Sequence, residues 1–145
     1  MTNDQLIALV QQDLKNERKH LAAYTQFAVQ LRGLHRNELR EFCETQAADE
    51  LVHVTQFSEL IVHLGGVPGT EVSKYPADLK CPAAIMKSIV EMEDEVADLY
   101  AIRLQQTHEM ENAATAYCHV FYETQIEDSW KTAREVELMI PKSEE

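Results

Sequence analysis

One arrangement of acidic and aromatic residues occurs twice along this chain. Each copy has a glutamate, a tyrosine seven residues later, and a second glutamate followed three residues on by an aromatic ring. Residues three, four or seven apart share one face of an α-helix, so each copy predicts two helices whose acids lie on defined faces. The two copies are offset by 76 residues in their first halves and 77 in their second; they comprise Glu17, Tyr24, Glu50 and His53, then Glu93, Tyr100, Glu127 and Trp130.

Apolar residues recur at helical spacing in four segments, which predicts an all-α fold. The first helix is expected to start at a cap on Asn3 or Asp4 and to reach about Arg32, before Gly33. The remaining three are expected between the turn at 35–37 and the glycines at 65–66, from Pro82 to about His108, and from a turn at Glu111–Asn112 to just before Pro141. The inward stripe of the last helix is expected to comprise Tyr117, Val120, Phe121, Glu127, Trp130 and Val136.

The segment 65–81 is the one extended stretch that reads as non-helical. It holds three of the four glycines and two of the four prolines. Antiparallel neighbours need only a short turn, so a connection of this length indicates a crossover that runs along a bundle. We therefore expect a single domain over residues 1–145: a four-helix bundle with a long crossover between helices two and three. The tail after Pro141 is too short for a fifth helix.

Charge and cysteine usage narrow the class of protein. The formal net charge of −12 argues against nucleic acid as a partner, because a phosphate backbone would be repelled. No apolar run approaches the ~20 residues of a membrane span, and the first residues lack the pattern of a signal peptide. The three cysteines are widely spaced and form no CxxC motif, which argues against a zinc ribbon. Unpaired thiols fit a reducing compartment, so a cytoplasmic location is expected.

The acids on the predicted stripes point to a metal. Glu50 and His53 lie on one helix face and can hold one ion together. A carboxylate in a core is costly unless a cation or a metal pairs with it. The alternative is that these acids face solvent, but their repetition at matched offsets favours a shared site. Glu, Glu-x-x-His, Glu and Glu-x-x-His on four helices is how a bundle builds a two-metal carboxylate site.

With these motifs, and with the LGGVP turn at 64–68, the chain resembles the ferritin-like superfamily over nearly its whole length, most closely the bacterioferritin branch. The resemblance implies two iron ions and reaction with dioxygen or peroxide. It also implies that Glu17 and His53 are terminal ligands of one iron, that Glu50 and Glu93 bridge, and that Glu127 serves the other. Tyr24 would hydrogen-bond a bridging carboxylate, although a core aromatic is the other interpretation.

Three departures from the family pattern change what is expected. Trp130 stands where the second histidine belongs, and an indole cannot bind a metal, so the second ion should be held more weakly. Leu51 stands where haem-binding relatives have methionine, so no haem is expected. The missing fifth helix argues against a 24-subunit cage, and we expect a homodimer.

Two residue assignments remain open. His20 follows Glu17 by three residues and is a possible replacement for the missing imidazole; the alternative is a surface histidine. Glu123 competes with Glu127 as the inward acid of the last helix. The 77-residue offset favours Glu127, and we take the recurrence of Glu-Thr-Gln from 44–46 at 123–125, with an offset of 79, as coincidence. The histidines at 35, 63, 108 and 119 have no partner at ligand spacing.

The expected function is an iron-binding protein with a two-ion or asymmetric site that acts as a ferroxidase or as an oxidase using dioxygen or peroxide. Two alternatives stand beside it: a degenerate site that holds one ion without turnover, and a structural module in which the acids pair with lysine and arginine. Carboxylate and imidazole ligands suit iron, manganese and zinc alike.

Overall fold

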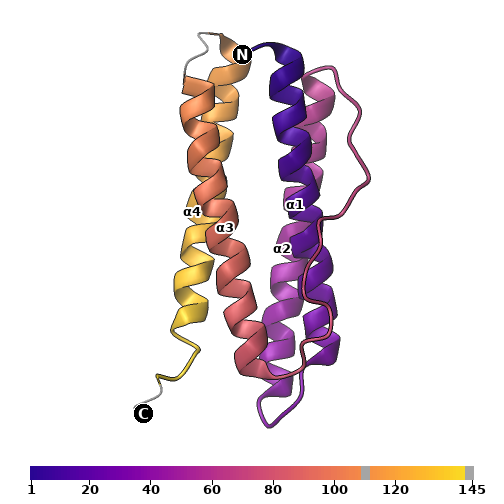
Figure 1. Cartoon of the computed structure of the whole chain (residues 1–145), viewed down its shortest axis with the longest axis vertical. Helices are drawn as coiled ribbons and strands as arrows, with labels where there is room; N and C mark the ends of the chain where they lie inside the picture. Colours follow the sequence, from indigo (N-terminus) through magenta and orange to yellow (C-terminus); the bar gives the residue numbers. More distant parts are fainter. Residues whose placement is uncertain (109–111, 143–145) are drawn as a thin grey trace. The chain divides into compact units, whose positions relative to one another are not determined.

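A computed structural model of the chain describes residues 1–108 and 112–142. Within these ranges it contains four helices and no strand: α1 (Asn3–Gln30), α2 (Arg36–His63), α3 (Pro82–His108) and α4 (Ala113–Glu137) (Figure 1). The prediction of an all-α fold is confirmed. None of the helices in these ranges has a stretch long and apolar enough to span a bilayer. The chain divides into two compact units, Thr2–Ile85 with α1 and α2 and Met86–Glu145 with most of α3 and with α4.

The start of α1 differs slightly from the sequence prediction. Thr2, rather than Asn3 or Asp4, caps the helix: its hydroxyl accepts from the backbone N–H of Gln5, and the Gln5 side chain accepts from the backbone N–H of Thr2. This reciprocal pair satisfies two of the free N–H groups at a helix start, which a single cap on Asn3 cannot do. The Asn3 amide instead donates to the carbonyl of Leu64 at 2.8 Å, tying the start of α1 to the end of α2.

The other helix ends follow the sequence signals. Gly65 adopts a positive φ of 95°, and the N–H of Gly66 reaches back to the carbonyl of Ile61 at 2.9 Å, which closes α2. Pro82 is the first residue of α3, and Asn112 caps α4 through Thr115. Glu111 of the predicted turn and residues 143–145 of the predicted tail lie outside the described ranges.

The crossover between α2 and α3 is hydrogen-bonded along α1. Gln11 binds it twice, donating to the carbonyl of Val67 at 2.6 Å and accepting from the N–H of Gly69 at 2.8 Å. Further along, the side chain of Gln26 donates to the carbonyl of Ala77 at 2.9 Å, and the backbone N–H of Arg32 donates to the carbonyl of Lys80. The crossover therefore follows α1 for most of its length (Figure 1), which confirms the predicted long connection.

In the first unit, α1 and α2 run antiparallel and share an apolar core that also contains acids and a histidine. The buried side chains of α1 include Leu14, Tyr24 and Phe27, and those of α2 include Phe57 and Ile61. Within this layer the buried polar residues are Asp13, Glu17, His20 and Glu50. The core of this unit is thus built to accommodate polar groups at its centre.

In the second unit, α4 presents a different face from the one predicted. Its buried residues are Thr115, Cys118, Tyr122, Gln125, Ser129, Ala133 and Val136. The expected inward residues Tyr117, Val120 and Trp130 are each more than half exposed. Tyr122 packs on Tyr100 of α3, with ring centres 5.3 Å apart. The predicted stripe was right for Val136 but wrong for Glu127 and Trp130, which the 77-residue offset had placed inward. An offset of 79 aligns α4 with α2, and brings Cys43 to Tyr122, Glu50 to Ser129 and Phe57 to Val136.

Candidate metal centre

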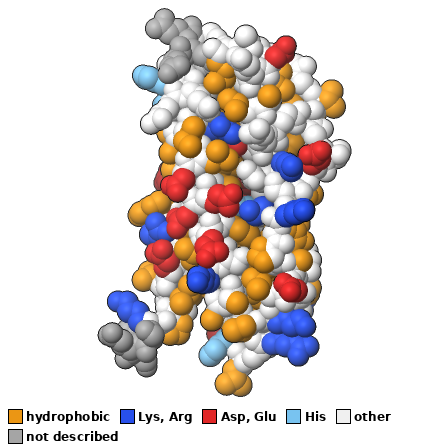
Figure 2. Space-filling view, in the orientation of Figure 1, with side chains coloured by type: hydrophobic (Ala, Val, Ile, Leu, Met, Phe, Trp, Pro, Cys, Tyr) orange, Lys and Arg blue, Asp and Glu red, His pale blue; other side chains and the backbone are white. Residues whose placement is uncertain are grey.

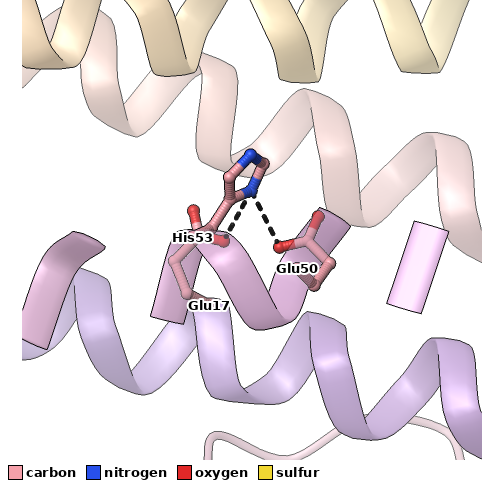
Figure 3. A group of neighbouring side chains, drawn as sticks. All are labelled: Glu17, Glu50 and His53. Atoms are coloured by element: carbon pink, nitrogen blue, oxygen red, sulfur yellow. Dashed lines mark hydrogen bonds and ion pairs between the residues drawn. The ribbon is translucent and has the colours of Figure 1, made fainter. Parts of the chain in front are cut away.

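Three of the predicted ligands meet in the core of the first unit. Glu17 projects from α1, and Glu50 and His53 project from successive turns of α2. Nδ1 of His53 lies 3.2 Å from Oε2 of Glu50 and 3.5 Å from Oε2 of Glu17. One ligand atom from each of the three residues lies within 4.8 Å of the other two. Figure 3 shows the imidazole reaching both carboxylates. The two helices therefore bring three donors to one point, of which the Glu-x-x-His spacing predicted only the pair Glu50 and His53.

The electrostatics of this group are those of acids held away from water. Burial, and then the charge of Glu50, raises the pKa of Glu17 to about 7, against a lowering contribution from its hydrogen bond with His53. Burial also acts to raise the pKa of Glu50, but hydrogen bonds with His20, His53 and Glu17 outweigh it, and the pKa of Glu50 is lowered. A divalent cation would remove the repulsion between two buried carboxylates. The donor set, two carboxylates and one imidazole, fits iron.

His20 lies inside the protein, which excludes the alternative of a surface histidine. Its side chain is 1% exposed, and Nδ1 lies 3.8 Å from Oε1 of Glu50. Glu50 therefore presents one oxygen toward His53 and the other toward His20. The signal for this placement was the three-residue spacing from Glu17, which puts both side chains on one face of α1.

The two mirrored tyrosines and Glu93 are also buried. Tyr24 is fully buried one turn beyond His20, with ring centres 6.5 Å apart and edge-on geometry. Tyr100 is fully buried on α3, and Glu93, two turns earlier on the same helix, is 2% exposed. These positions agree with the expectation that the first acid and the tyrosine of each copy face the interior.

The acids of α4 lie elsewhere. Glu123 and Glu127 are both exposed, so the structure groups neither with the buried acids. Trp130 is 54% exposed, and the guanidinium of Arg134 stacks over its ring at 5.0 Å. The buried polar residues of α4 are all neutral: Thr115, Gln125 and Ser129. The burial pattern thus follows the Glu-Thr-Gln recurrence that the sequence argument took as coincidence.

Two histidines that were expected to lack partners have carboxylate neighbours three or four residues later in the chain. Nε2 of His119 lies 3.2 Å from Oε1 of Glu123, and Nδ1 of His35 lies 3.6 Å from Oε2 of Glu38. The expectation was wrong for these two residues, because a histidine that precedes an acid by three or four residues also brings its side chain close to the carboxylate.

The surface carries charges of both signs. On the face drawn in Figure 2, lysine and arginine side chains are interspersed with aspartate and glutamate.

Comparison with known structures identifies the fold. A ferritin-like diiron-carboxylate protein from Bacillus anthracis is 24% identical, with a TM-score of 0.87 over 97% of this chain and all of that one. A DPS protein from Vibrio cholerae is 14% identical, with a TM-score of 0.88 over 96% of this chain and 91% of that one. A dodecameric thioferritin from Bacteroides fragilis, described as bacterioferritin-related, is 15% identical, with a TM-score of 0.68 over 96% of this chain and 90% of that one.

The sequence itself agrees with this fold. No protein of curated function matches it significantly. The family model for the ferritin-like domain matches residues 7–140, nearly the whole chain. The chain therefore belongs to the ferritin-like domain family.

Proposed function

We propose that this protein binds iron at Glu17, Glu50 and His53 and oxidises it, or a small substrate, with dioxygen or peroxide. The observation that carries the proposal is the convergence of two buried carboxylates and an imidazole within 4.8 Å of one another. Burying two carboxylates at less than 4% exposure costs free energy unless a cation compensates their charge, and a bound metal ion would do so. Iron bound there would supply the electrons for reduction of dioxygen or peroxide.

The residues of this chain have separate roles in the proposal. Glu17 and His53 are terminal ligands, and Glu50 offers one oxygen on each side. His20 faces the second oxygen of Glu50, so we assign it as the imidazole that replaces the one lost at Trp130. Glu93, buried on α3, is the proposed second bridging acid. Tyr24 remains the residue proposed to hydrogen-bond a bridging carboxylate, and its ring also packs edge-on against that of His20.

A second candidate function is supported by the face of α4. Gln125 and Ser129 occupy its interior positions, and Glu127 is exposed, so this helix brings no buried acid. Such a centre would be asymmetric, with one well-liganded ion and one held weakly. In the limiting case the protein holds a single ion without turnover, as a buffer rather than an oxidase.

An anaerobic titration with iron(II) tests the proposal. We expect at least one tight ion per chain, lost in the double variant Glu50→Ala, His53→Ala. The matched control is Glu59→Ala, His63→Ala, which removes the same residue types from exposed positions of the same helix. Equal binding by the two double variants would contradict the metal site. Addition of dioxygen then separates the functions: oxygen consumption supports the oxidase, and tight binding without consumption supports the buffer.

We also propose that the protein works as a homodimer in a reducing compartment. The α2 helix leaves Leu51, Val52 and Val62 more than half exposed, and burial against a second copy would remove this apolar surface from water. The cysteines are free thiols, which suits such a compartment. Light scattering coupled to size exclusion tests the assembly: a monomer at micromolar concentration would contradict it, whereas a dodecamer would extend it.

A further inference from the structure

Two histidines lie side by side in the second unit, and neither belongs to the candidate metal centre. His108 is the last residue of α3, and His119 lies in the second turn of α4. Their ring centres are 5.8 Å apart, and their planes are inclined by 46°. Both rings line one open pocket of about 300 Å³, together with Leu104 and Gln105. Two imidazoles from different helices thus share one solvent-accessible hollow.

The position of Glu123 favours one tautomer of the neutral His119 ring. Oε1 of Glu123 lies 3.2 Å from Nε2 of His119, and a carboxylate accepts a hydrogen bond, so this tautomer carries its proton on Nε2. The other nitrogen, Nδ1, then carries a free lone pair. This atom is buried and has no hydrogen-bond partner among the described residues. A carboxylate on one ring nitrogen and a lone pair on the other is the arrangement found in metal-ligating histidines.

The separation of the rings suits a shared ion. With a metal–nitrogen bond of about 2.0–2.1 Å, two imidazoles on one ion have ring centres roughly 5 to 6.5 Å apart. The observed 5.8 Å falls within this range. Stacked aromatic rings would instead lie nearly parallel, and the observed inclination of 46° is not of that kind.

We propose that His108 and His119 form a second metal site, oriented by Glu123, for a divalent transition ion that prefers nitrogen ligands, such as Zn²⁺ or Cu²⁺. Imidazole suits these ions better than it suits magnesium or calcium, which prefer oxygen. Because the pocket is open to solvent, water would supply the remaining ligands. The site differs in chemistry from the carboxylate-rich centre of the first unit and is accessible from solvent.

Binding of Cu²⁺ to the full chain tests this site. The background is Glu50→Ala, His53→Ala, so that the candidate metal centre does not compete and the two proposals fail independently. We expect one Cu²⁺ per chain, with hyperfine splitting from two imidazole nitrogens in the electron paramagnetic resonance spectrum. His108→Ala and His119→Ala should each weaken binding at least tenfold, and Glu123→Ala by about 10- to 100-fold.

The control is His35→Ala, because His35 also has a carboxylate neighbour, Glu38, at 3.6 Å but contributes to no described pair of rings. It should leave Cu²⁺ affinity unchanged. Unchanged affinity in His119→Ala, or a spectrum with a single imidazole, would overturn the proposal. Should the background variant fail to fold, as judged by circular dichroism, the same spectra on the otherwise unaltered chain decide: His119→Ala must remove the two-imidazole signal.

Discussion

Replacing Glu17 by glutamine should stabilise the metal-free protein at alkaline pH while abolishing the proposed metal site. Burial and the charge of Glu50 raise the pKa of Glu17 from 4.5 to about 7. The folded state therefore binds more protons than the unfolded state between these two values, and stability falls as pH rises through them. The wild-type protein carries the full penalty above pH 7. Glutamine resembles the protonated acid in shape and is uncharged, so the substitution removes this penalty.

The size of this effect follows from the two pKa values. One pKa unit corresponds to about 1.4 kcal/mol, so ionising Glu17 in the fold costs about 3 kcal/mol at pH 8 and about 1 kcal/mol at pH 5. The substitution weakens the hydrogen bond with His53 and loses about 1 kcal/mol at both pH values. The net expectation is a gain of about 2 kcal/mol at pH 8 and almost none at pH 5.

Urea unfolding after dialysis against a chelator measures the change in unfolding free energy at pH 5 and at pH 8. Glu59→Gln, an exposed acid on α2, is the matched control and should change stability equally at the two pH values. Equal effects of Glu17→Gln at pH 5 and pH 8, or destabilisation at pH 8, would refute the reasoning. Added iron(II) should reverse the order, because only the wild-type chain keeps the complete donor set.

Three further predictions concern other parts of the chain. Trp130→His should leave the metal content of the purified protein unchanged, because this side chain is 54% exposed; a rise from one ion to two would contradict the assignment. Burial raises the pKa of Cys43 to about 12 and that of Cys118 to about 11, so a disulfide reagent at pH 8 should titrate only Cys81 in the folded protein and all three thiols in urea. Gln11→Ala removes two hydrogen bonds to the crossover, so limited proteolysis there should accelerate and stability should fall by about 1 kcal/mol; an unchanged cleavage rate would mean that the crossover is held by other contacts.

Much of the fold was readable from local chemistry. Glycine at 65, proline at 82 and asparagine at 112 act within one helical turn, so they marked helix ends correctly. The cap at Thr2 was missed by one residue because asparagine and aspartate favour the N-cap position at least as strongly as threonine does. Only the reciprocal hydrogen bonds between Thr2 and Gln5 make Thr2 the cap.

The candidate site was half readable for a similar reason. Glu50 and His53 share a helix face by spacing alone, and the burial of Glu17 followed from its place on an apolar stripe. The face of α4 did not follow. Its stripe contains Gln125 and Ser129, which are polar, and its exposed side contains Val120 and Trp130, which are apolar, so hydrophobicity favoured the wrong side.

The sequence by itself determined four helices, the long crossover and the pairing of Glu50 with His53 on one helix face, because each of these depends on spacing along one helix or on a local turn. Tertiary structure decided which donors meet. Whether His20 faces Glu50, and whether His119 faces His108, depends on how neighbouring helices are rotated about their own axes. A rotation of one residue, about 100° on a helix, exchanges a ligand for a surface side chain, and only packing against the adjacent helix selects between them.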